Sequence, residues 1–531
     1  MHNSSNLKVR RSILELQTEY DNGNKKPLED LMRAWKGIKE LPPTDPNSFF
    51  MLSGFHGEPF RGPGTYANAW WGGYCQHGTV LFPTWHRVYL FKLEKALQSI
   101  PGCENVMLPF WDECNPNAQN NGIPRALTDE KFMLDDGVEI DNPLRSFVLP
   151  IAITDQVSQD NNDPNSPNYS KPKGYETVRY PLSGLLGTPA DQQATRDHNA
   201  GFPNYAANVK TLDANIMAWL TLPVYSGKQN RGLVVDKFHA CLDAPNYTLF
   251  SNTTSQRAWN DANPSSSVTS LESPHNYIHL AVGGFDTPNY NASPISGANG
   301  DMGENDTAAL DPIFYFHHCF IDYTFWIWQR RHRATKGFTI DIQDPGASYA
   351  NNQPPAGANP GDQLTMATPM IPFQHDDGTM FVSNDCVDIE GQLGYTYGPG
   401  SLDDFAVSPE TTALLTAAGP TNQVRVSGID RSKIAGSFII AAYAEVDGMH
   451  RLVGAEAVLS RWTVVGCANC QTRLRAGSHF QVASEKLGSS VKVVIHTRNG
   501  PIGDVPPTFQ SSGQLRAIAT QVDVPFKVEI I

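Results

Sequence analysis

The sequence predicts a mainly α-helical N-terminal part with long loops, followed by an all-β C-terminal part of the sandwich type. Apolar residues recur at helical spacing in several segments before residue 334. Stretches rich in Asn, Asp, Pro and Gly between about residues 115 and 210 indicate long loops with little regular structure. Beyond residue 428, short β-branched and aromatic runs alternate with Gly, Ser and Asn-Gly turns.

Helices are expected in four segments of the N-terminal part, at residues 27–41, 88–100, 274–282 and 311–333. In the first segment Leu28, Leu31, Trp35 and Ile38 follow a helical period, and two prolines close it. Pro-Gly ends the second segment and Gly-Gly the third, whereas Pro312 suits the first turn of the fourth. These segments predict a helical core.

Strands are expected in the C-terminal part at residues 436–446, 451–459, 479–483 and 490–497. About 100 residues with this pattern are typical of a β-sandwich. We therefore divide the chain into a helical domain (1–397), a linker (398–428) and a β-rich domain (429–531).

Composition and charge limit the partners. The net charge of −14 and the pI of about 5.5 disfavour binding to nucleic acid or to an anionic membrane surface. No N-terminal signal-peptide pattern and no apolar run of membrane-spanning length occurs, so we expect a soluble, cytoplasmic protein. The eight cysteines are spread too thinly for a disulfide scaffold.

Histidines on inward-facing positions carry the functional signal. His86 shares a helical face with Leu90, Leu93 and Leu97, although a lone histidine there is more often a hydrogen-bonded core residue. His275 and His279 are four residues apart on one helix, which is a usual spacing for two ligands of one metal ion. His318 lies on the inward stripe of the fourth helix, together with Asp322.

With His56 and His77, the set reaches six histidines. Structural zinc sites usually include Cys or carboxylate ligands, and non-haem iron oxygenases pair two histidines with a carboxylate. All-imidazole groups of three favour copper instead. Two such groups would hold two copper ions, which together can give two electrons to O₂ as co-substrate.

Two segments resemble the copper signatures of a known family. "HGTVLFPTWHRVYLFKLE" (77–94) and "DPIFYFHHCFID" (311–322) are similar to the two copper motifs of the tyrosinase, catechol oxidase and molluscan haemocyanin family. The resemblance covers about residues 1–397 and ends at "GYTY" (394–397). It implies a four-helix bundle that holds two coppers, one on His56, His77 and His86 and the other on His275, His279 and His318.

The resemblance also assigns roles next to the ligands. Cys75, two residues before His77, matches a cysteine that forms a thioether to the imidazole; the alternative is an unmodified buried thiol. His317 is then an outer or packing residue. Asp322 is expected to accept a hydrogen bond that orients a ligand ring, against the alternative of a solvated helix carboxylate.

Four further residues bear on access and proton transfer. Asn305 aligns with a Phe gate of plant relatives and would leave the entrance more open, or else it lies in a surface turn. Asn276 and Glu272 match a pair that holds a proton-accepting water in relatives that hydroxylate monophenols. Glu272 could instead complement a helix N-terminus. Leu280 is expected to add apolar lining to the substrate site.

The C-terminal part resembles, more weakly, family domains that cover the active-site mouth as a permanent lid, a removable shield or a packing partner. Its "CANC" motif, Cys467 and Cys470, resembles a copper-delivery pair, with a disulfide or an inert pair as alternatives.

Three functions follow from the resemblance. The leading one is a copper-dependent tyrosinase that hydroxylates monophenols and oxidises o-diphenols to o-quinones. The alternatives are an o-diphenol or o-aminophenol oxidase without hydroxylase activity and a haemocyanin-like O₂ carrier. The expected partners are small phenols, with neither nucleic acid nor membrane; the pattern is compatible with a homo-oligomer but does not specify one.

Overall fold

The structure is a computed structural model that describes residues 7–57, 73–154, 170–186, 189–225, 230–285, 300–349, 361–406, 421–446, 448–461, 474–483, 491–498, 500–503 and 524–531. Its α-helices are α1 Ile13–Asp21, α2 Lys26–Glu40, α3 Phe49–Gly54, α4 Phe82–Gln98, α5 Pro116–Asn121, α6 Pro189–Asn199, α7 Tyr205–Thr221, α8 Leu233–Cys241, α9 Tyr247–Ser251, α10 Thr253–Ala262, α11 Glu272–Gly283 and α12 Ile313–Arg331. The strands of the helical part are β1 Lys8–Arg10, β2 Lys131–Met133, β3 Glu139–Asp141, β4 Ile153–Thr154, β5 Ser170–Lys171, β6 Pro223–Tyr225, β7 Asn230–Gly232, β8 Pro369–Gln374, β9 Met380–Val382 and β10 Tyr395–Tyr397.

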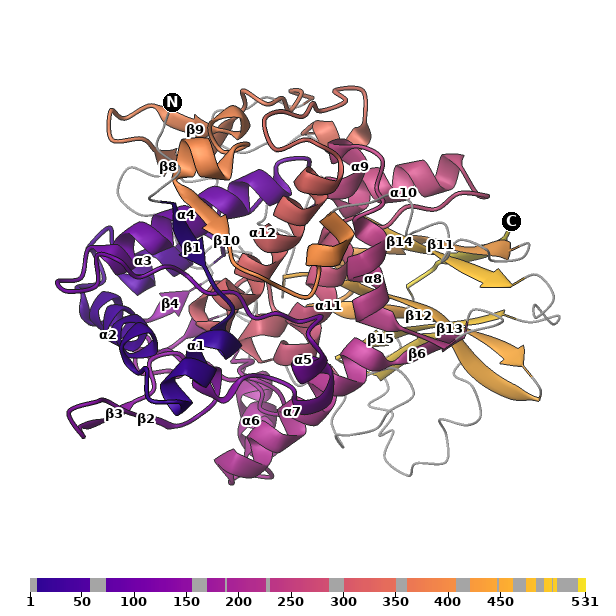
Figure 1. The fold of residues 1–531 in the computed structure, drawn as a ribbon. Helices are drawn as coiled ribbons and strands as arrows, with labels where there is room; N and C mark the ends of the chain where they lie inside the picture. The colour runs from indigo at the N-terminus through magenta and orange to yellow at the C-terminus, as the bar shows by residue number, and fades with distance from the viewer. Residues whose placement is uncertain are drawn as a thin grey trace, which may run out of the picture.

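A bundle of helices forms the centre of the molecule. α2 packs on α4, α4 on α12 and α12 on α11 (Figure 1). The predicted helices 27–41, 274–282 and 311–333 correspond to α2, α11 and α12, and the segment 88–100 is the second half of α4, which begins earlier, at Phe82. Nearly every side chain of α11 and α12 is buried, so these two helices lie in the core of the helical part.

The region between residues 115 and 210 holds more regular structure than we expected. α6 spans eleven residues and α7 begins at Tyr205. Asn115 and Asn204 act as N-caps, because their side-chain oxygens accept from Asn117 N and Ala207 N. Asparagine thus starts helices here, although we interpreted it as a sign of loops.

The C-terminal part forms two antiparallel sheets, as predicted. Its strands are β11 Thr421–Asp430, β12 Phe438–Val446, β13 Met449–Val458, β14 Arg475–Ala483, β15 Val491–Thr497, β16 Gly500–Gly503 and β17 Lys527–Ile530. One sheet has the order β13-β12-β15-β16 and the other β14-β11-β17. Val424 and Val426 of one sheet share an apolar cluster with Ile440 and Val493 of the other. β11 begins at Thr421, inside the segment 398–428 that we expected to be a linker.

The β-rich part lies beside the helical part, and β13 contacts α11 (Figure 1). Within the helical part, the N-terminal strand β1 pairs in parallel with β10. Among the described residues, no helix combines the length and the apolarity needed to cross a bilayer.

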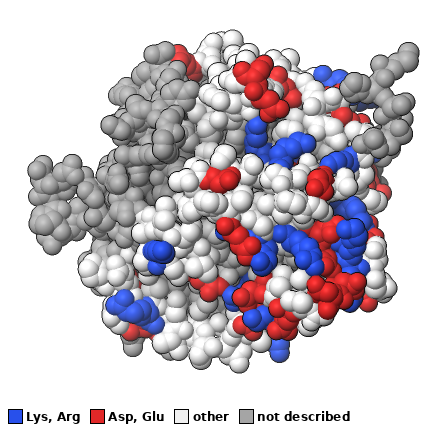
Figure 2. All heavy atoms as spheres, turned by 90° about the vertical axis from the view of Figure 1, so that its left-hand side faces the viewer, with Lys and Arg blue, Asp and Glu red and all other residues white. Residues whose placement is uncertain are grey.

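The face on the left of Figure 1 carries interleaved acidic and basic side chains (Figure 2). Ion pairs include Lys26 with Asp30 at 2.8 Å and Lys131 with Asp141 at 2.6 Å. Exposed pairs of this kind contribute little to stability, because solvent screens their charges. The stability of the fold therefore comes mainly from its buried core.

Candidate metal centre

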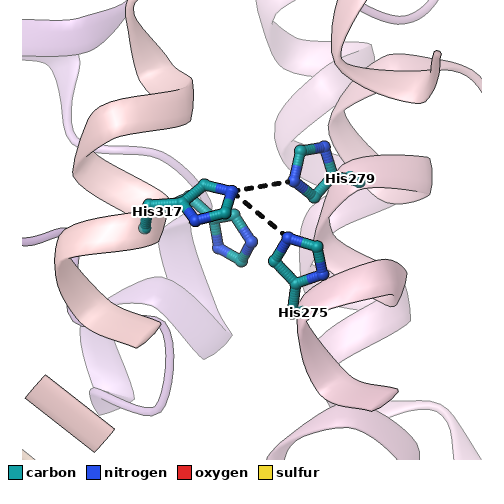
Figure 3. A group of neighbouring side chains, drawn as sticks. His275, His279 and His317 are labelled. Carbon is teal, nitrogen blue, oxygen red and sulfur yellow. Dashed lines mark hydrogen bonds between the residues drawn. The ribbon is translucent and has the colours of Figure 1, made fainter. Parts of the chain in front are cut away.

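Three histidines from α11 and α12 converge on one point. The Nε2 atom of His318 lies 3.2 Å from Nε2 of His275 and 3.3 Å from Nε2 of His279. All three rings are buried. Figure 3 shows the rings of His275 and His279 side by side on one helix, turned toward the helix that carries His317.

Backbone and amide oxygens hold the outer nitrogens of these rings. The Nδ1 atom of His275 lies 3.0 Å from Asn276 Oδ1, and that of His279 lies 2.9 Å from the Met302 carbonyl oxygen. Because a carbonyl oxygen can only accept, each Nδ1 carries the proton and each Nε2 presents a lone pair. Two lone pairs therefore face the same nitrogen of His318.

A second group of three histidines lies against the first. His56 follows α3, His77 lies in the segment before α4, and His86 is on α4. Their candidate ligand nitrogens all lie within 4.8 Å of one another. His86 Nδ1 is 2.8 Å from the Phe82 carbonyl oxygen, which leaves its Nε2 aimed inward without a protein partner.

The two groups face each other across a short gap. The rings of His86 and His318 are nearly parallel, with centroids 4.5 Å apart, and the centroids of His77 and His275 are 5.4 Å apart. Six imidazoles from six separate positions thus meet in one buried space.

The donor set fits two metal ions. Metal-bound imidazole nitrogens lie about 2.0–2.1 Å from the ion, so two of them around one ion are roughly 3.3 Å apart, as on the His318 side. Burial lowers the pKa of His86 to about 3 and that of His279 to about 4, so both rings are neutral at pH 7. Neutral rings with converging lone pairs are what a metal site requires.

His317, which we expected to be an outer or packing residue, is paired with a buried carboxylate. Its Nδ1 lies 2.6 Å from Glu113 Oε1, and both residues are fully buried. Its ring stacks on His275 with centroids 5.2 Å apart. A nitrogen of His317 also belongs, with those of His275, His279 and His318, to one group of candidate ligand atoms. That His318 rather than His317 is the third ligand stays a prediction. Sequence reasoning missed Glu113, which is 204 positions away from His317.

Cys75 and Asn305 meet at the edge of the site. Asn305 Nδ2 donates to Cys75 Sγ at 3.5 Å, and Asn305 N donates to the Ser460 carbonyl oxygen at 3.1 Å. Asn305 is 6% exposed, so the alternative that it lies in a surface turn is wrong. We expected Asn305 to leave the entrance to the metal site more open, but the β-rich part covers this residue.

A pocket between the two parts leads to the histidines. Cys75, His77, Glu272, Asn276 and Asn305 line it from the helical side. Glu272 is the first residue of α11; its Oε1 accepts from Gly78 N at 2.8 Å and its Oε2 from Thr253 N at 2.8 Å. Burial raises the pKa of Glu272 despite these donors.

Leu280 lies elsewhere. It is fully buried in the main apolar cluster and is not among the described residues that line the pocket, so it packs the core rather than the substrate space. Cys467 and Cys470 fall outside the described residues.

Asp322 has partners other than those we predicted. Its oxygens accept from Arg87 Nε at 2.6 Å, Tyr395 OH at 2.7 Å and Tyr397 OH at 2.6 Å, and Arg10 Nη1 lies at 3.3 Å. Burial raises the pKa of Asp322, but the two guanidinium groups outweigh it and the net pKa is lowered. Asp322 therefore anchors α12 to α4, β1 and β10 instead of holding a ligand ring.

Comparison with known proteins identifies the family. A family model for the common central domain of tyrosinase matches residues 46–331, which is more than half of the chain. The chain belongs to the tyrosinase family. It is 50% identical over 511 residues to the tyrosinase HcTyr2 of a Hahella species, covering 90% of this chain and 89% of that protein.

Other tyrosinases agree over the full length. A tyrosinase of Aspergillus oryzae is 40% identical, covering 93% of this chain and 94% of its own. A solved tyrosinase structure from Burkholderia thailandensis, recorded at low pH, superimposes with a TM-score of 0.82 at 47% identity, covering 99% of this chain and 100% of that chain. The predicted family and fold class are thus confirmed. The chain is a tyrosinase-type oxidase, and the two buried histidine groups are those that could hold its metal ions.

Proposed function

We propose that the chain hydroxylates monophenols at the ortho position and oxidises o-diphenols to o-quinones at a pair of copper ions, with O₂ reduced to water. The observation that carries this proposal is the meeting of two groups of three imidazoles, five of them buried and that of His77 half-buried, with the ring centroids of His86 and His318 4.5 Å apart. His56, His77 and His86 would hold one copper and His275, His279 and His318 the other. When bound, the two coppers supply the two-electron chemistry with O₂.

The protein's own residues set the ligand geometry. The carbonyl oxygens of Phe82 and Met302 and the Asn276 amide oxygen fix three ligand rings with their Nε2 lone pairs inward. The Glu113–His317 pair supports the His275 ring from behind. The apolar surroundings exclude bulk water from the ligands.

Glu272 is the proposed proton acceptor for an incoming monophenol. Its carboxylate lines the same pocket as His77 and Asn276, and its raised pKa brings it closer to that of a useful general base. With Asn276 it would hold a water that takes the phenol proton. Overall, one monophenol and one O₂ yield one o-quinone and one water. This is a four-electron oxidation of the phenol, in which one oxygen atom enters the ring and the other leaves as water.

Two further assignments belong to this proposal. The Cys75 sulfur would join the His77 ring through a thioether, which fixes a ligand that stands in a loop. The β-rich part would act as a lid: Ser460 holds Asn305, and Ser437 Oγ donates to the Gly303 carbonyl oxygen at 2.7 Å. Copper delivery by Cys467 and Cys470 remains a proposal from the sequence alone.

Substituting Glu272 tests the proton-transfer assignment. Glu272→Gln should lower tyrosine hydroxylation about 10²-fold, because the monophenol loses its proposed proton acceptor, while oxidation of the matching catechol falls much less. Glu15→Gln, which changes a first-turn acid of the exposed helix α1, is the matched control. Unchanged hydroxylation by Glu272→Gln would remove its assigned role. A wild-type chain that oxidises catechol but not tyrosine would instead identify an o-diphenol oxidase.

A further inference from the structure

The last strand of the chain, β17, lies at the edge of a sheet in the β-rich part. Among the described residues the order of that sheet is β14-β11-β17, so β17 pairs with β11 on one side and its other side is an edge. Figure 1 shows the C-terminus at the side of the β-rich part that faces away from the helical part. A sheet edge presents main-chain N–H and C=O groups to which another strand can bind.

The hydrogen bonds of β17 fix which main-chain groups point to this edge. Ile531 N donates to the Gln423 carbonyl oxygen at 2.9 Å, and Gln423 N donates to the Ile531 carbonyl oxygen at 2.9 Å. Hydrogen-bonded and non-hydrogen-bonded pairs alternate along an antiparallel ladder. Every second residue of β17 therefore directs its main-chain groups to β11, and the main-chain groups of Val528 and Ile530 point to the edge.

The apolar side chains of β17 are more exposed than their neighbours on β11. Val528 lies directly opposite Val426, and Ile530 lies opposite the second β11 valine, Val424. Residues that lie directly opposite each other place their side chains on the same face of a sheet. The two β11 valines are buried in the cluster between the two sheets, but Val528 is 38% and Ile530 51% exposed. The apolar face of this sheet thus continues to its edge and is open to solvent there.

The other face of β17 carries one charge of each sign. Lys527 and Glu529 flank Val528, and both are exposed. Glu529 also pairs with Arg425 of β11 at 3.0 Å, on the side away from the edge. Because Lys527 and Glu529 are two residues apart, they lie on the same face of the strand. A strand with this pattern can be complementary to a second copy of itself.

A second copy of β17 fits the edge best in one antiparallel register. If Val528 lies opposite Val528 of the other copy, their outward N–H and C=O groups form two hydrogen bonds. Lys527 of each copy then lies opposite Glu529 of the other. A register centred on Lys527 would place the two lysines opposite each other, and one centred on Glu529 the two glutamates. Like charges directly opposite each other destabilise a strand pair, so the register centred on Val528 is favoured.

We propose that two copies of the chain associate through β17, paired antiparallel about a two-fold axis at Val528. The two sheets then form one continuous sheet, in which Ile530 packs opposite Phe526 of the other copy. Phe526 already contacts the apolar cluster between the sheets, so the pairing extends that cluster across the two-fold axis. The contact involves few residues of each copy, so the dimer is weak and depends on concentration. This inference is independent of the metal site.

Exchanging the charges tests the register on the full chain. In sedimentation velocity over a roughly hundredfold range of concentration, the wild-type mass should rise from 58.4 kDa toward twice that value. Lys527→Glu and Glu529→Lys should each weaken association about tenfold, because like charges then lie opposite each other. An equimolar mixture of the two variants should associate as the wild type does, because a mixed pair restores opposite charges at both positions. Lys433→Glu, at an exposed lysine of the β-rich part outside β17, is the control and should associate normally.

A proline at the centre of β17 tests the location of the contact. Val528→Pro removes an N–H group that points to the edge and keeps the hydrogen bonds to β11, so the variant should fold and stay monomeric. In the wild type, hydrogen exchange of the main chain at residues 524–531 should become slower as the concentration rises. Should Val528→Pro unfold, the mixture of the two charge variants decides.

Three results would overturn the inference. The first is a wild type that remains at 58.4 kDa at every concentration. The second is association that persists in Val528→Pro, or that the charge variants or their mixture change in a way other than the one expected. The third is slow exchange at residues 524–531 that does not depend on concentration, since another segment of the same chain would then cover the edge.

Discussion

The two histidine groups are built in different ways. His275, His279 and His318 stand on two helices, and hydrogen-bond acceptors next to α11 fix two of their rings. In the other group only His86 stands on a helix with a backbone acceptor, whereas His56 and His77 occupy irregular segments. Helical spacing alone can place ligands, but loop ligands depend on what surrounds them. A thioether at His77 would serve that need.

Replacing one candidate ligand in each histidine group should have the largest effect on activity. His86→Ala and His318→Ala should each lower catechol oxidation by at least about 10³-fold, because the reaction needs both metal ions. Copper content measured on the same samples should fall in both. Retention of full copper and activity by either variant would show that the replaced ring is not a ligand. The half-buried His375, which pairs with Asp385 outside the two histidine groups, is replaced by Ala as the control.

Replacing Asp322, which anchors the helix that carries His318, should have the second largest effect, on stability. Asp322→Asn leaves Arg87 and Arg10 as buried cations with a weakened partner, so the free energy of unfolding should fall by roughly 3–5 kcal/mol. Denaturant unfolding measures this change, and the control Asp141→Asn, in an exposed pair with Lys131, should leave the free energy of unfolding nearly unchanged. A normal stability with altered ligand geometry would instead support the ring-orienting role that the sequence suggested.

Replacing Asn276, whose side-chain oxygen accepts from the His275 ring, should have the smallest effect, on copper affinity. Asn276→Ala removes the oxygen that fixes Nδ1 of His275, so copper affinity should fall about 10-fold to 100-fold at one of the two sites. Competition with a chelator resolves the two affinities. Asn120→Ala, an exposed helix asparagine, should leave both unchanged. Equal weakening of both sites would contradict the separation into two groups.

Much of the site could be predicted because its ligands follow local patterns. The spacing of His275 and His279, the inward faces of α4 and α12 and the strand runs of the C-terminal part all depend on neighbours in the sequence. The same local logic failed for α5 and α7, where asparagines cap helices.

Some contacts could not be predicted from the sequence. All of them join segments that are far apart along the chain. Asp322 meets Arg10, Arg87, Tyr395 and Tyr397, and His317 meets Glu113. The hydrogen bond from Asn305 N to the Ser460 carbonyl oxygen joins the helical part to the β-rich part. A single sequence gives no signal for such pairings, since each depends on how the completed helices and sheets pack.

Copper stoichiometry tests the central claim most directly. The full chain, loaded with excess copper and freed of weakly bound ions, should hold two coppers per chain by elemental analysis, and His86→Ala or His318→Ala should hold about one. A wild-type chain that binds a single ion, or that retains zinc in preference to copper under the same conditions, would contradict the account.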